Sequence, residues 1–447
     1  MVRIPRFGRI KLPRLDGGNL RARLRAQRAW WRRRLRVLAG GHEVLFPAEG
    51  GGVVAVETLA GDAAAAGPRV AILHATAGSG HKSAALALAS AMGALDPGAR
   101  VREVDTLVFA SRFYRSTYSQ GYNAMAQRAP QLWGALYHLW GQERVRRAAG
   151  PTRQALDRLA LRSLVRVVEH EHPDAVVCTH FLPVEALAPR RGLGRMRVPL
   201  YVVITDFTAH PMWAYPHVDR YFVASDEVAD ELNGHGVPRE RIEVTGIPVD
   251  PRFARTIGRE AARSRMRLDP AAPAVLVMGG GSGVGPMGDL ARALAQLPSR
   301  PQLVVACGTN LRLLRDVESL GRQTAGRVRA LGYSNEIDVL LEAVDVVVSK
   351  AGGLTCAEAL IKRTPLVVFR PTPGQEVRNA QYLESGGAAV HADTIENVAT
   401  TVERWLADPA ARERVRANAG HLARPLAAET IARRVLESLP ASAVKTA

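Results

Sequence analysis

The sequence has few cysteines and no long apolar run. Only Cys178, Cys307 and Cys356 occur in 447 residues, far apart and at spacings that match no metal-ligand motif. Each lies in or beside an apolar segment, so we expect buried free thiols in a reducing compartment. No segment of about 18 consecutive apolar residues is present, so we expect no transmembrane helix. The basic N-terminus also has no continuous apolar segment of the kind found in secretory signals.

Acidic residues are almost absent from the first 36 positions, which hold thirteen Arg or Lys and one acidic residue, Asp16. Within this segment, LRARLRAQRAWWRRRLRVL places five apolar side chains within about 60° of one another on a helix. They are Leu20, Leu24, Trp31, Leu35 and Leu38. A basic amphipathic helix of this kind is typical of the surface of an anionic membrane. The alternatives are a solvated basic tail and a tail that binds nucleic acid, and charge alone does not separate the three.

From residue 69 onward, apolar strand candidates alternate with helical stretches, which predicts parallel sheets covered by helices on both faces. The first series is Val70–Ala75, Val101–Asp105, Ala175–Thr179, Leu200–Thr205, Tyr221–Ala224 and Ile242–Gly246. The second series is Ala274–Met278, Gln302–Ala306, Val328–Leu331, Val344–Val348, Leu366–Phe369 and Ala388–His391. Two prolines in TGIPVDPRF, residues 245–253, separate the two series and suggest a domain boundary.

The expected fold class is therefore α/β, with two consecutive Rossmann-like domains that face a ligand cleft. We predict an N-terminal domain over residues 67–252 and a C-terminal domain over residues 253–425. Residues 1–66 form a basic extension and a connector with one possible short hairpin, and residues 426–447 form a helical tail.

The stretch AILHATAGSGHKSAALALASAM, residues 71–92, combines an apolar strand, a Gly-rich turn and an Ala-rich helix. It is not a Walker A loop, because His81 separates Gly80 from Lys82. A dinucleotide-binding turn would need a third glycine where Ser83 stands. His81, in the first turn of a helix that faces the cleft, would suit a general base with a pKa near neutrality. A surface histidine at a helix cap is the alternative.

Three further turns in the second half combine glycines or polar residues with the end of a strand. Gly279–Gly283 with Ser282, and Ser349–Gly353, point backbone amides at a position suited to an anion. Glu358 lies one turn into the following helix, where a carboxylate can accept two hydrogen bonds from a ribose diol. Gln375, Glu376 and Asn379 carry amide and carboxylate groups that suit sugar hydroxyls. The alternatives are an exposed helix residue for Glu358 and a solvated loop and helix cap for the last three.

In the first half, VITDFTAHPMW, residues 203–213, ends a strand in Asp206. Asp206 would orient a histidine or bind hydroxyl groups, and His210 and Trp213 would contact a substrate. The alternative is a structural strand end with a core tryptophan.

The turns of the second half, in this order, resemble the C-terminal half of glycosyltransferase family 28, which has the GT-B fold. TAGSGHKSAA, VITDFTAHPMW, VDRYFVASDEV and GIPV look like the monogalactosyldiacylglycerol synthases and bacterial diacylglycerol glucosyltransferases. The resemblance covers roughly residues 69–425 and leaves residues 1–66 outside.

The resemblance implies a membrane-associated inverting transfer of a hexose from a UDP-sugar to the hydroxyl of diacylglycerol. His81 matches the family's base or acceptor-site histidine. His210–Trp213 matches an acceptor and anionic-lipid region, and the acceptor-binding residues that we expect are Gly80, Asp206, His210 and Trp213. The donor residues implied are Gly280, Gly281, Ser282, Gly283, Gly352 and Gly353 for the diphosphate, Glu358 for the ribose, Tyr333 and Asn310 near the nucleotide, and Gln375, Glu376 and Asn379 for the sugar.

We expect chemistry without a metal or other cofactor, because two helix N-termini can stabilise the leaving diphosphate and no Asp-x-Asp signature lies at a sheet edge. The expected partners are UDP-hexose, diacylglycerol and anionic membrane lipids that contact residues 1–38, with no nucleic acid. The expected location is the cytoplasmic face of the membrane. The alternative function is a UDP-sugar-dependent transferase or epimerase with another acceptor, such as a cell-wall lipid precursor or a soluble sugar.

Overall fold

The computed structural model describes residues 44–47, 53–56, 67–76, 79–120 and 129–439. The chain divides into two compact units, residues 1–63 and 64–447. In the first unit, β1 (Val44–Pro47) and β2 (Val53–Val56) pair antiparallel, which confirms the expected hairpin. The predicted basic helix over residues 20–38 lies outside the described residues.

The N-terminal half of the second unit is a parallel sheet of six strands in the order β4-β3-β5-β6-β7-β8. All six strands expected there are present: β3 (Arg69–His74), β4 (Arg100–Asp105), β5 (Ala175–Cys178), β6 (Leu200–Val203), β7 (Arg220–Val223) and β8 (Ile242–Val244). The connecting helices are α2 (Gly80–Leu95), α3 (Arg112–Arg115), α5 (Pro130–Gly141), α6 (Glu143–Ala160), α7 (Arg162–Glu171), α8 (Phe181–Gly192) and α9 (Asp226–Gly234), with short turns η1 (Thr106–Phe109), η2 (Ser116–Gln120), η3 (Pro211–Trp213), η4 (Arg239–Arg241) and η5 (Pro251–Ala254).

The C-terminal half is a second parallel sheet of six strands in the order β11-β10-β9-β12-β13-β14. Its strands are β9 (Ala274–Met278), β10 (Gln302–Gly308), β11 (Val328–Gly332), β12 (Val346–Ser349), β13 (Leu366–Phe369) and β14 (Ala389–Ala392). Its helices are α10 (Arg259–Arg265), α11 (Met287–Leu294), α12 (Leu311–Gln323), α13 (Ile337–Ala343), α14 (Gly353–Ile361), α15 (Gln375–Ser385), α16 (Ile395–Ala407), α17 (Pro409–Leu422) and α18 (Ala427–Glu437). The central strands β9, β12 and β13 are buried along their whole length, because helices cover both faces.

In each sheet the chain adds strands first on one side of the first strand and then on the other, so each sheet has one topological switch point. In the N-terminal sheet this point lies between β3 and β5, and in the C-terminal sheet it lies between β9 and β12. Open α/β sheets bind ligands beyond the carboxyl ends of such strands. The turn that carries His81 follows β3, and the turns at Gly279–Gly283 and Ser349–Gly353 follow β9 and β12. The sequence-predicted loops therefore occupy the ligand-binding ends of both sheets.

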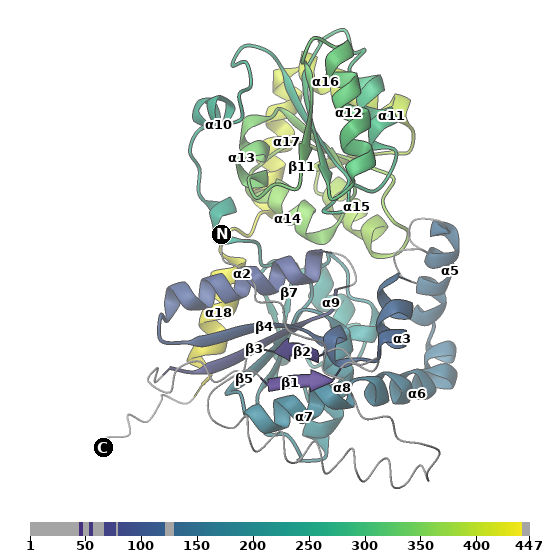
Figure 1. Cartoon of the computed structure of the whole chain (residues 1–447), viewed down its shortest axis with the longest axis vertical. Helices are drawn as coiled ribbons and strands as arrows, with labels where there is room; N and C mark the ends of the chain where they lie inside the picture. The colour runs from purple at the N-terminus through teal and green to yellow at the C-terminus, as the bar shows by residue number, and fades with distance from the viewer. Residues whose placement is uncertain (1–43, 48–52, 57–66, 77–78, 121–128, 440–447) are drawn as a thin grey trace, which may run out of the picture. The chain divides into compact units, whose positions relative to one another are not determined.

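The last helix, α18, returns to the N-terminal sheet. Ile431 and Val435 share a buried core with Val70 and Ile72 of β3. In Figure 1 the yellow α18 lies beside the blue-violet α2. The predicted helical tail is thus helical through Glu437, and it is a layer of the N-terminal half.

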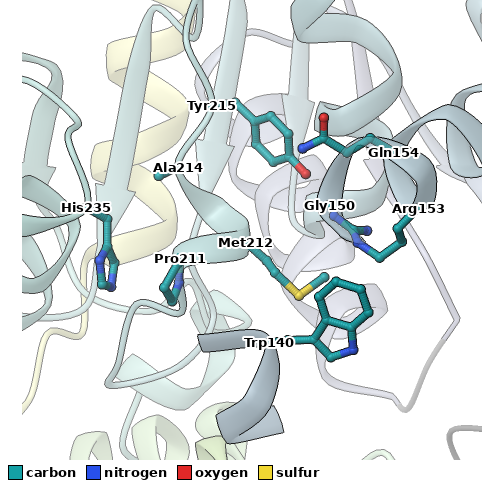
Figure 2. Close-up of a pocket in the computed structure, with 9 residues that line it drawn as sticks. All are labelled: Trp140, Gly150, Arg153, Gln154, Pro211, Met212, Ala214, Tyr215 and His235. Atoms are coloured by element: carbon teal, nitrogen blue, oxygen red, sulfur yellow. The ribbon is translucent and has the colours of Figure 1, made fainter. Parts of the chain in front are cut away.

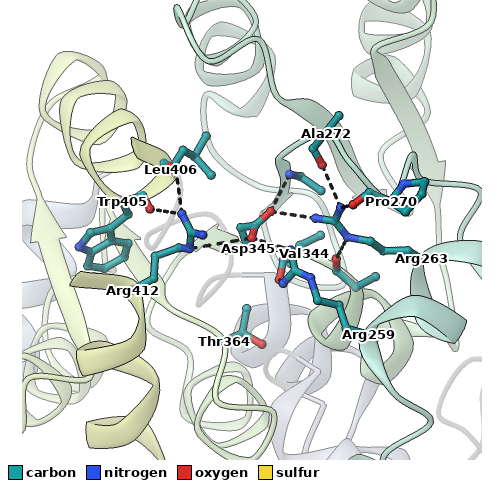
Figure 3. A network of polar contacts seen from close by, with 12 residues as sticks. Arg259, Arg263, Pro270, Ala272, Val344, Asp345, Thr364, Trp405, Leu406 and Arg412 are labelled. Carbon is teal, nitrogen blue, oxygen red and sulfur yellow. Dashed lines mark hydrogen bonds and ion pairs between the residues drawn. The ribbon is translucent and has the colours of Figure 1, made fainter. Parts of the chain in front are cut away.

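Asp345, which directly precedes β12, holds the amino-terminal edge of the C-terminal sheet together (Figure 3). Its buried carboxylate accepts hydrogen bonds from Arg259 at 2.5 Å, from Arg263 at 2.9 Å and from the backbone amide of Ala274 at 2.9 Å. Arg412 of α17 lies 3.9 Å away. One carboxylate thus joins α10, α17 and the start of β9.

Asp345→Asn is expected to lower the free energy of unfolding by about 3 kcal/mol, because the buried Arg263 would lose its counter-ion. Urea unfolding of both proteins measures the difference. The control is Asp289→Asn, whose partner Arg292 is exposed, and we expect a change of about 0.5 kcal/mol or less there. Equal urea midpoints for Asp345→Asn and the unmodified protein would contradict the role given to this carboxylate.

Candidate active site at the carboxyl ends of the two sheets

His81 lies in the first turn of α2, and its ring is held by two contacts from neighbouring strands. Nδ1 lies 2.7 Å from the carbonyl oxygen of Thr179 and 3.1 Å from the hydroxyl oxygen of Thr205. Because a carbonyl oxygen only accepts, Nδ1 carries the hydrogen, and the neutral ring keeps its lone pair on Nε2. No hydrogen bond from the described residues reaches Nε2. The ring is thus oriented as a proton acceptor.

Aromatic rings surround His81. Its ring centroid lies 4.6 Å from that of His180 in an edge contact and 6.4 Å from that of Trp213. This desolvation lowers the pKa of His81 to about 4, although the bond to Thr179 opposes the shift, and it lowers the pKa of His180 well below its usual value. The expected pKa near neutrality is therefore wrong for the free protein, and His81 is uncharged at neutral pH.

The other predicted acceptor residues lie in and around η3. Trp213 is buried, and its ring lies tilted against His180 and edge to face against Phe181. His210 caps η3, and its Nε2 lies 3.2 Å from the carbonyl oxygen of Tyr137, whose ring it also contacts at 4.5 Å. His210 thus joins η3 to α5, while Trp213 packs against the His81 ring.

The turn at η3 also lines a cavity of about 170 Å³ (Figure 2). Pro211 and Met212 form one wall, and Trp140 and Arg153 come from α5 and α6. The Arg153 guanidinium already pairs at 2.8 Å with each of two carboxylates, on Asp157 and Glu185. Since its charge is compensated within the protein, this cavity is not an anion site.

The Gly-rich turn after β9 lies against the start of α2. A Cβ at Gly281 would lie 3.4 Å from the hydroxyl oxygen of Ser79, which precedes α2. At Gly283 the backbone is left-handed, with φ of 57°, and a Cβ would overlap the Cys307 carbonyl. The donor-side turn and the His81 turn are therefore neighbours in this unit.

Asn310 stabilises the Gly-rich turn after β9. Its amide nitrogen donates to the Gly283 carbonyl at 2.9 Å, and its oxygen accepts from the Leu313 amide at 3.1 Å as the cap of α12. The sequence predicts a nucleotide contact for Asn310. The structure gives the amide a bracing role for the Gly-rich turn.

The N-terminus of α14 meets the end of β6. Gly352 caps this helix, and a Cβ at Gly353 would overlap the carbonyl oxygen of Thr205 and lie 3.1 Å from Asp206 Oδ1. A Cβ at Gly80 would lie 3.5 Å from Leu354. Three glycines, two on the donor side and one on the acceptor side, thus line this junction of backbone segments.

Glu358 lies one turn further into α14, and its carboxyl group makes no hydrogen bond with the described residues. Burial raises the pKa of its carboxyl group to about 8, with Arg252 opposing and Asp250 and Asp338 adding to the shift. An unpaired, desolvated carboxyl group of this kind is typical of a binding position. Tyr333, predicted to border the uracil, is 70% exposed.

The three predicted sugar residues of α15 differ in their environments. Glu376 pairs with Lys350 at 2.9 Å and accepts from the Thr372 amide at 2.6 Å. Asn379 is fully buried and bonds only to protein groups. Gln375 is the first residue of α15. A direct sugar contact stays a prediction for Gln375 and Glu376, whereas both donors and the acceptor of the Asn379 amide bond within the protein.

Residues missed by the sequence reasoning are Thr179 and His180, after β5, together with Thr205 and Lys350. Thr179 and Thr205 hold the His81 ring, and His180 packs on it. The signal was present, because β5 borders β3 and its apolar run AVVC ends in a polar Thr-His pair.

The part of the chain that the structure describes contains neither a metal centre nor a membrane span. No group of three His, Cys, Asp or Glu side chains there is arranged to hold a metal ion. None of the described helices is long and apolar enough to cross a bilayer.

Two family models match the chain. That of monogalactosyldiacylglycerol (MGDG) synthase covers residues 81–249, and that of the glycosyltransferase family 28 C-terminal domain covers residues 274–436. The processive diacylglycerol beta-glucosyltransferase of Bacillus cereus (strain B4264) is 36% identical over 234 residues, which are 52% of this chain and 59% of that relative. The enzyme of the same name from Bacillus pumilus (strain SAFR-032) is 30% identical over 275 residues, 61% of this chain and 71% of that relative. The first of these matches therefore spans about three fifths of the relative's length.

Solved structures share the fold at low sequence identity. MurG from Acinetobacter baumannii aligns with a TM-score of 0.54 and 17% identity, over 83% of this chain and 99% of that one. UDP-GlcNAc 2-epimerase from Neisseria meningitidis aligns with a TM-score of 0.55 and 11% identity, over 83% of this chain and 100% of that one. The two parallel six-stranded sheets are thus GT-B-like. With the family models and the Bacillus relatives, this fold shows that the chain belongs to the family of the MGDG synthases and processive diacylglycerol glucosyltransferases.

Proposed function

We propose that the protein transfers a hexose from a UDP-sugar to the free hydroxyl of diacylglycerol, with inversion at the anomeric carbon. The observation that carries the proposal is the approach of the Gly-rich turn after β9 to the turn that holds His81. A phosphate-binding element and an oriented base then act on the same reacting atoms. The names of the Bacillus relatives, which are diacylglycerol glucosyltransferases, support this choice of acceptor.

In the proposed mechanism, His81 Nε2 accepts the proton of the acceptor hydroxyl while its oxygen attacks the anomeric carbon and the UDP oxygen leaves. A pKa of about 4 makes His81 a weak base in the free protein. The two negative charges of a bound diphosphate favour the imidazolium form and raise that pKa. Donor binding therefore strengthens the base at the moment it is needed.

On the donor side, the amides of Gly280–Gly283 and of Gly352 and Gly353 would bind the diphosphate. Ser282 adds a hydroxyl group, Glu358 would bind the ribose and Tyr333 would border the uracil. The hexose would contact Gln375 and Glu376. These helix and loop amides supply positive potential to the leaving group, which is how we account for catalysis with protein groups alone.

On the acceptor side, diacylglycerol would enter beside Gly80, Asp206, His210 and Trp213. Residues 1–38 would lie on the anionic cytoplasmic surface of the membrane, where each Arg or Lys near the surface contributes about 1 kcal/mol. A lipid acceptor requires the protein to attach to the membrane, because the acceptor hydroxyl stays at the bilayer surface.

The test is transfer from radiolabelled UDP-glucose, UDP-galactose or UDP-glucuronate to diacylglycerol in vesicles with and without anionic lipid. We expect a labelled glycolipid with one of these donors, and more of it on anionic vesicles. Transfer only to a water-soluble sugar, or epimerisation of the donor, would contradict the proposed function and support the alternative one. Removal of residues 1–38 with unchanged vesicle binding would overturn the role of that segment alone.

Glu358→Gln is expected to remove a pH dependence of donor binding. In the free protein Glu358 is protonated below a pKa of about 8, whereas a ribose diol binds best to the carboxylate. UDP-hexose affinity should therefore rise with pH up to about 8, by at most about tenfold per pH unit, and this rise should be absent in the variant. Calorimetric titrations across this range measure both. Parallel curves for the two proteins would place Glu358 outside the ribose site.

A further inference from the structure

Asn379 joins three segments of the chain, which are its own helix α15, the loop after β6 and the turn before α14. Its oxygen accepts from the Phe207 amide at 2.7 Å, and its nitrogen donates to Asp206 Oδ1 at 2.8 Å and to the Ala351 carbonyl at 2.9 Å. An amide group has two N–H donors and one oxygen acceptor, so both donors and the acceptor are in use. Asn379 is also fully buried.

The three segments serve both proposed substrates. Asp206 and Phe207 follow β6, in the loop that leads to the acceptor residues of η3. Ala351 lies two residues before α14, whose first amides are the proposed diphosphate site. Asn379 itself lies on α15, one turn after the proposed sugar residues. One side chain thus connects the acceptor loop, the diphosphate loop and the sugar helix.

Neighbouring side chains on the same face of α15 continue this contact. Tyr382 stacks on Phe207 with ring centroids 4.7 Å apart, and Arg378 pairs with Glu231 of α9. Positions 378, 379 and 382 share one helix face. This face of α15 is therefore an interface with the N-terminal half, and Asn379 is its buried centre.

We propose that Asn379 is a positioning residue that fixes the acceptor loop after β6 against the donor loops after β12 and at α15. It acts through Asp206 and Ala351 and does not touch the sugar. The proposal rests on the proposed function for its activity readout. The competing role is a direct sugar contact, which the amide would reach only after giving up its bonds to the two loops.

Exchanging the amide at position 379 and the carboxylate at position 206 distinguishes a positioning role from a direct sugar contact. Asn379→Asp places a carboxylate against Asp206 and repels it, so we expect kcat/KM for UDP-hexose to fall about 100-fold. Asp206→Asn keeps an acceptor for the Asn379 amide and is expected to lose less than about tenfold. In the double variant, the amide introduced at position 206 would donate to the carboxylate introduced at position 379, and we expect kcat/KM at least tenfold above that of Asn379→Asp alone. If the losses of the two single variants multiply, Asn379 binds the sugar directly and the proposal is overturned.

Small-angle scattering of the four substrate-free proteins gives a readout that needs no activity. The repelling pair in Asn379→Asp should separate the two halves and increase the radius of gyration, and the double variant should restore it. Equal radii in all four proteins would also overturn the proposal. If the unmodified protein transfers no hexose but the radii of gyration follow this order, the proposed function is contradicted, whereas the positioning role of Asn379 is supported.

Discussion

Replacing His81 with glutamine is expected to lower kcat by about 10²- to 10⁴-fold, the usual contribution of a general base. Glutamine keeps most of the ring's volume and a polar amide, but it has no basic lone pair for the acceptor proton. The effect should fall on kcat, because the residues proposed to bind the diphosphate, ribose and uracil lie on the other half of the unit. Initial rates at saturating donor and acceptor, with UDP affinity measured in parallel, test this expectation.

The matched control is His170→Gln, an exposed histidine in the last turn of α7. It should change kcat by less than about twofold. If His81→Gln turns over at a rate close to that of the control variant, another group accepts the proton.

The pH profiles of kcat and kcat/KM carry a second signature of the same residue when they are measured in Glu358→Gln, where the carboxyl group at position 358 no longer contributes. A general base acts when unprotonated, so the rate falls as pH falls through its pKa. The profile of kcat/KM for the donor reports the free protein, in which the pKa of His81 is about 4. The profile of kcat reports the loaded site, where the diphosphate raises that pKa. The acid limb of kcat should therefore lie at higher pH than that of kcat/KM.

The strands and the ligand-binding turns were predictable because both depend on local sequence. A strand buried on both faces needs a continuous apolar run, and AVLVM at residues 274–278 and LVVF at residues 366–369 are such runs. Turns that hold backbone amides near an anion need glycine, and the two Gly-rich turns directly follow β9 and β12. His81 was identifiable because it interrupts a turn of this type.

The functions of individual side chains were less predictable, since they depend on contacts between distant segments. Asn379 has the residue type of a sugar ligand, and only the bonds to Asp206 and Ala351, 173 and 28 positions away, give it another role. The pKa of His81 depends on its burial and on the Thr179 carbonyl, which follows another strand, β5. Likewise α18 reads as a tail, although it packs beside α2.

Gly353→Ala is expected to reduce kcat/KM for the donor by at least about 100-fold. The added methyl group would overlap the Thr205 carbonyl, a backbone group two residues after β6 that cannot rotate aside as a flexible side chain can. To relieve the overlap, α14 must retreat from the N-terminal half. That retreat carries the proposed diphosphate amides away from His81, and misplacements of about 1 Å in such a site cost about 100-fold.

Gly93→Ala is the control, because Gly93 is an exposed glycine near the end of α2, outside both proposed substrate sites. Its helical backbone suits alanine, and a Cβ there would meet no atom within 4 Å. The same methyl group should then change kcat/KM by less than about threefold. Because each half has its own buried sheet, the melting temperature of Gly353→Ala should stay close to that of the control, so that the loss is one of alignment. Comparable activity in the two variants would show that α14 and β6 need not meet during transfer, and it would remove the junction at Thr205 from the account of catalysis.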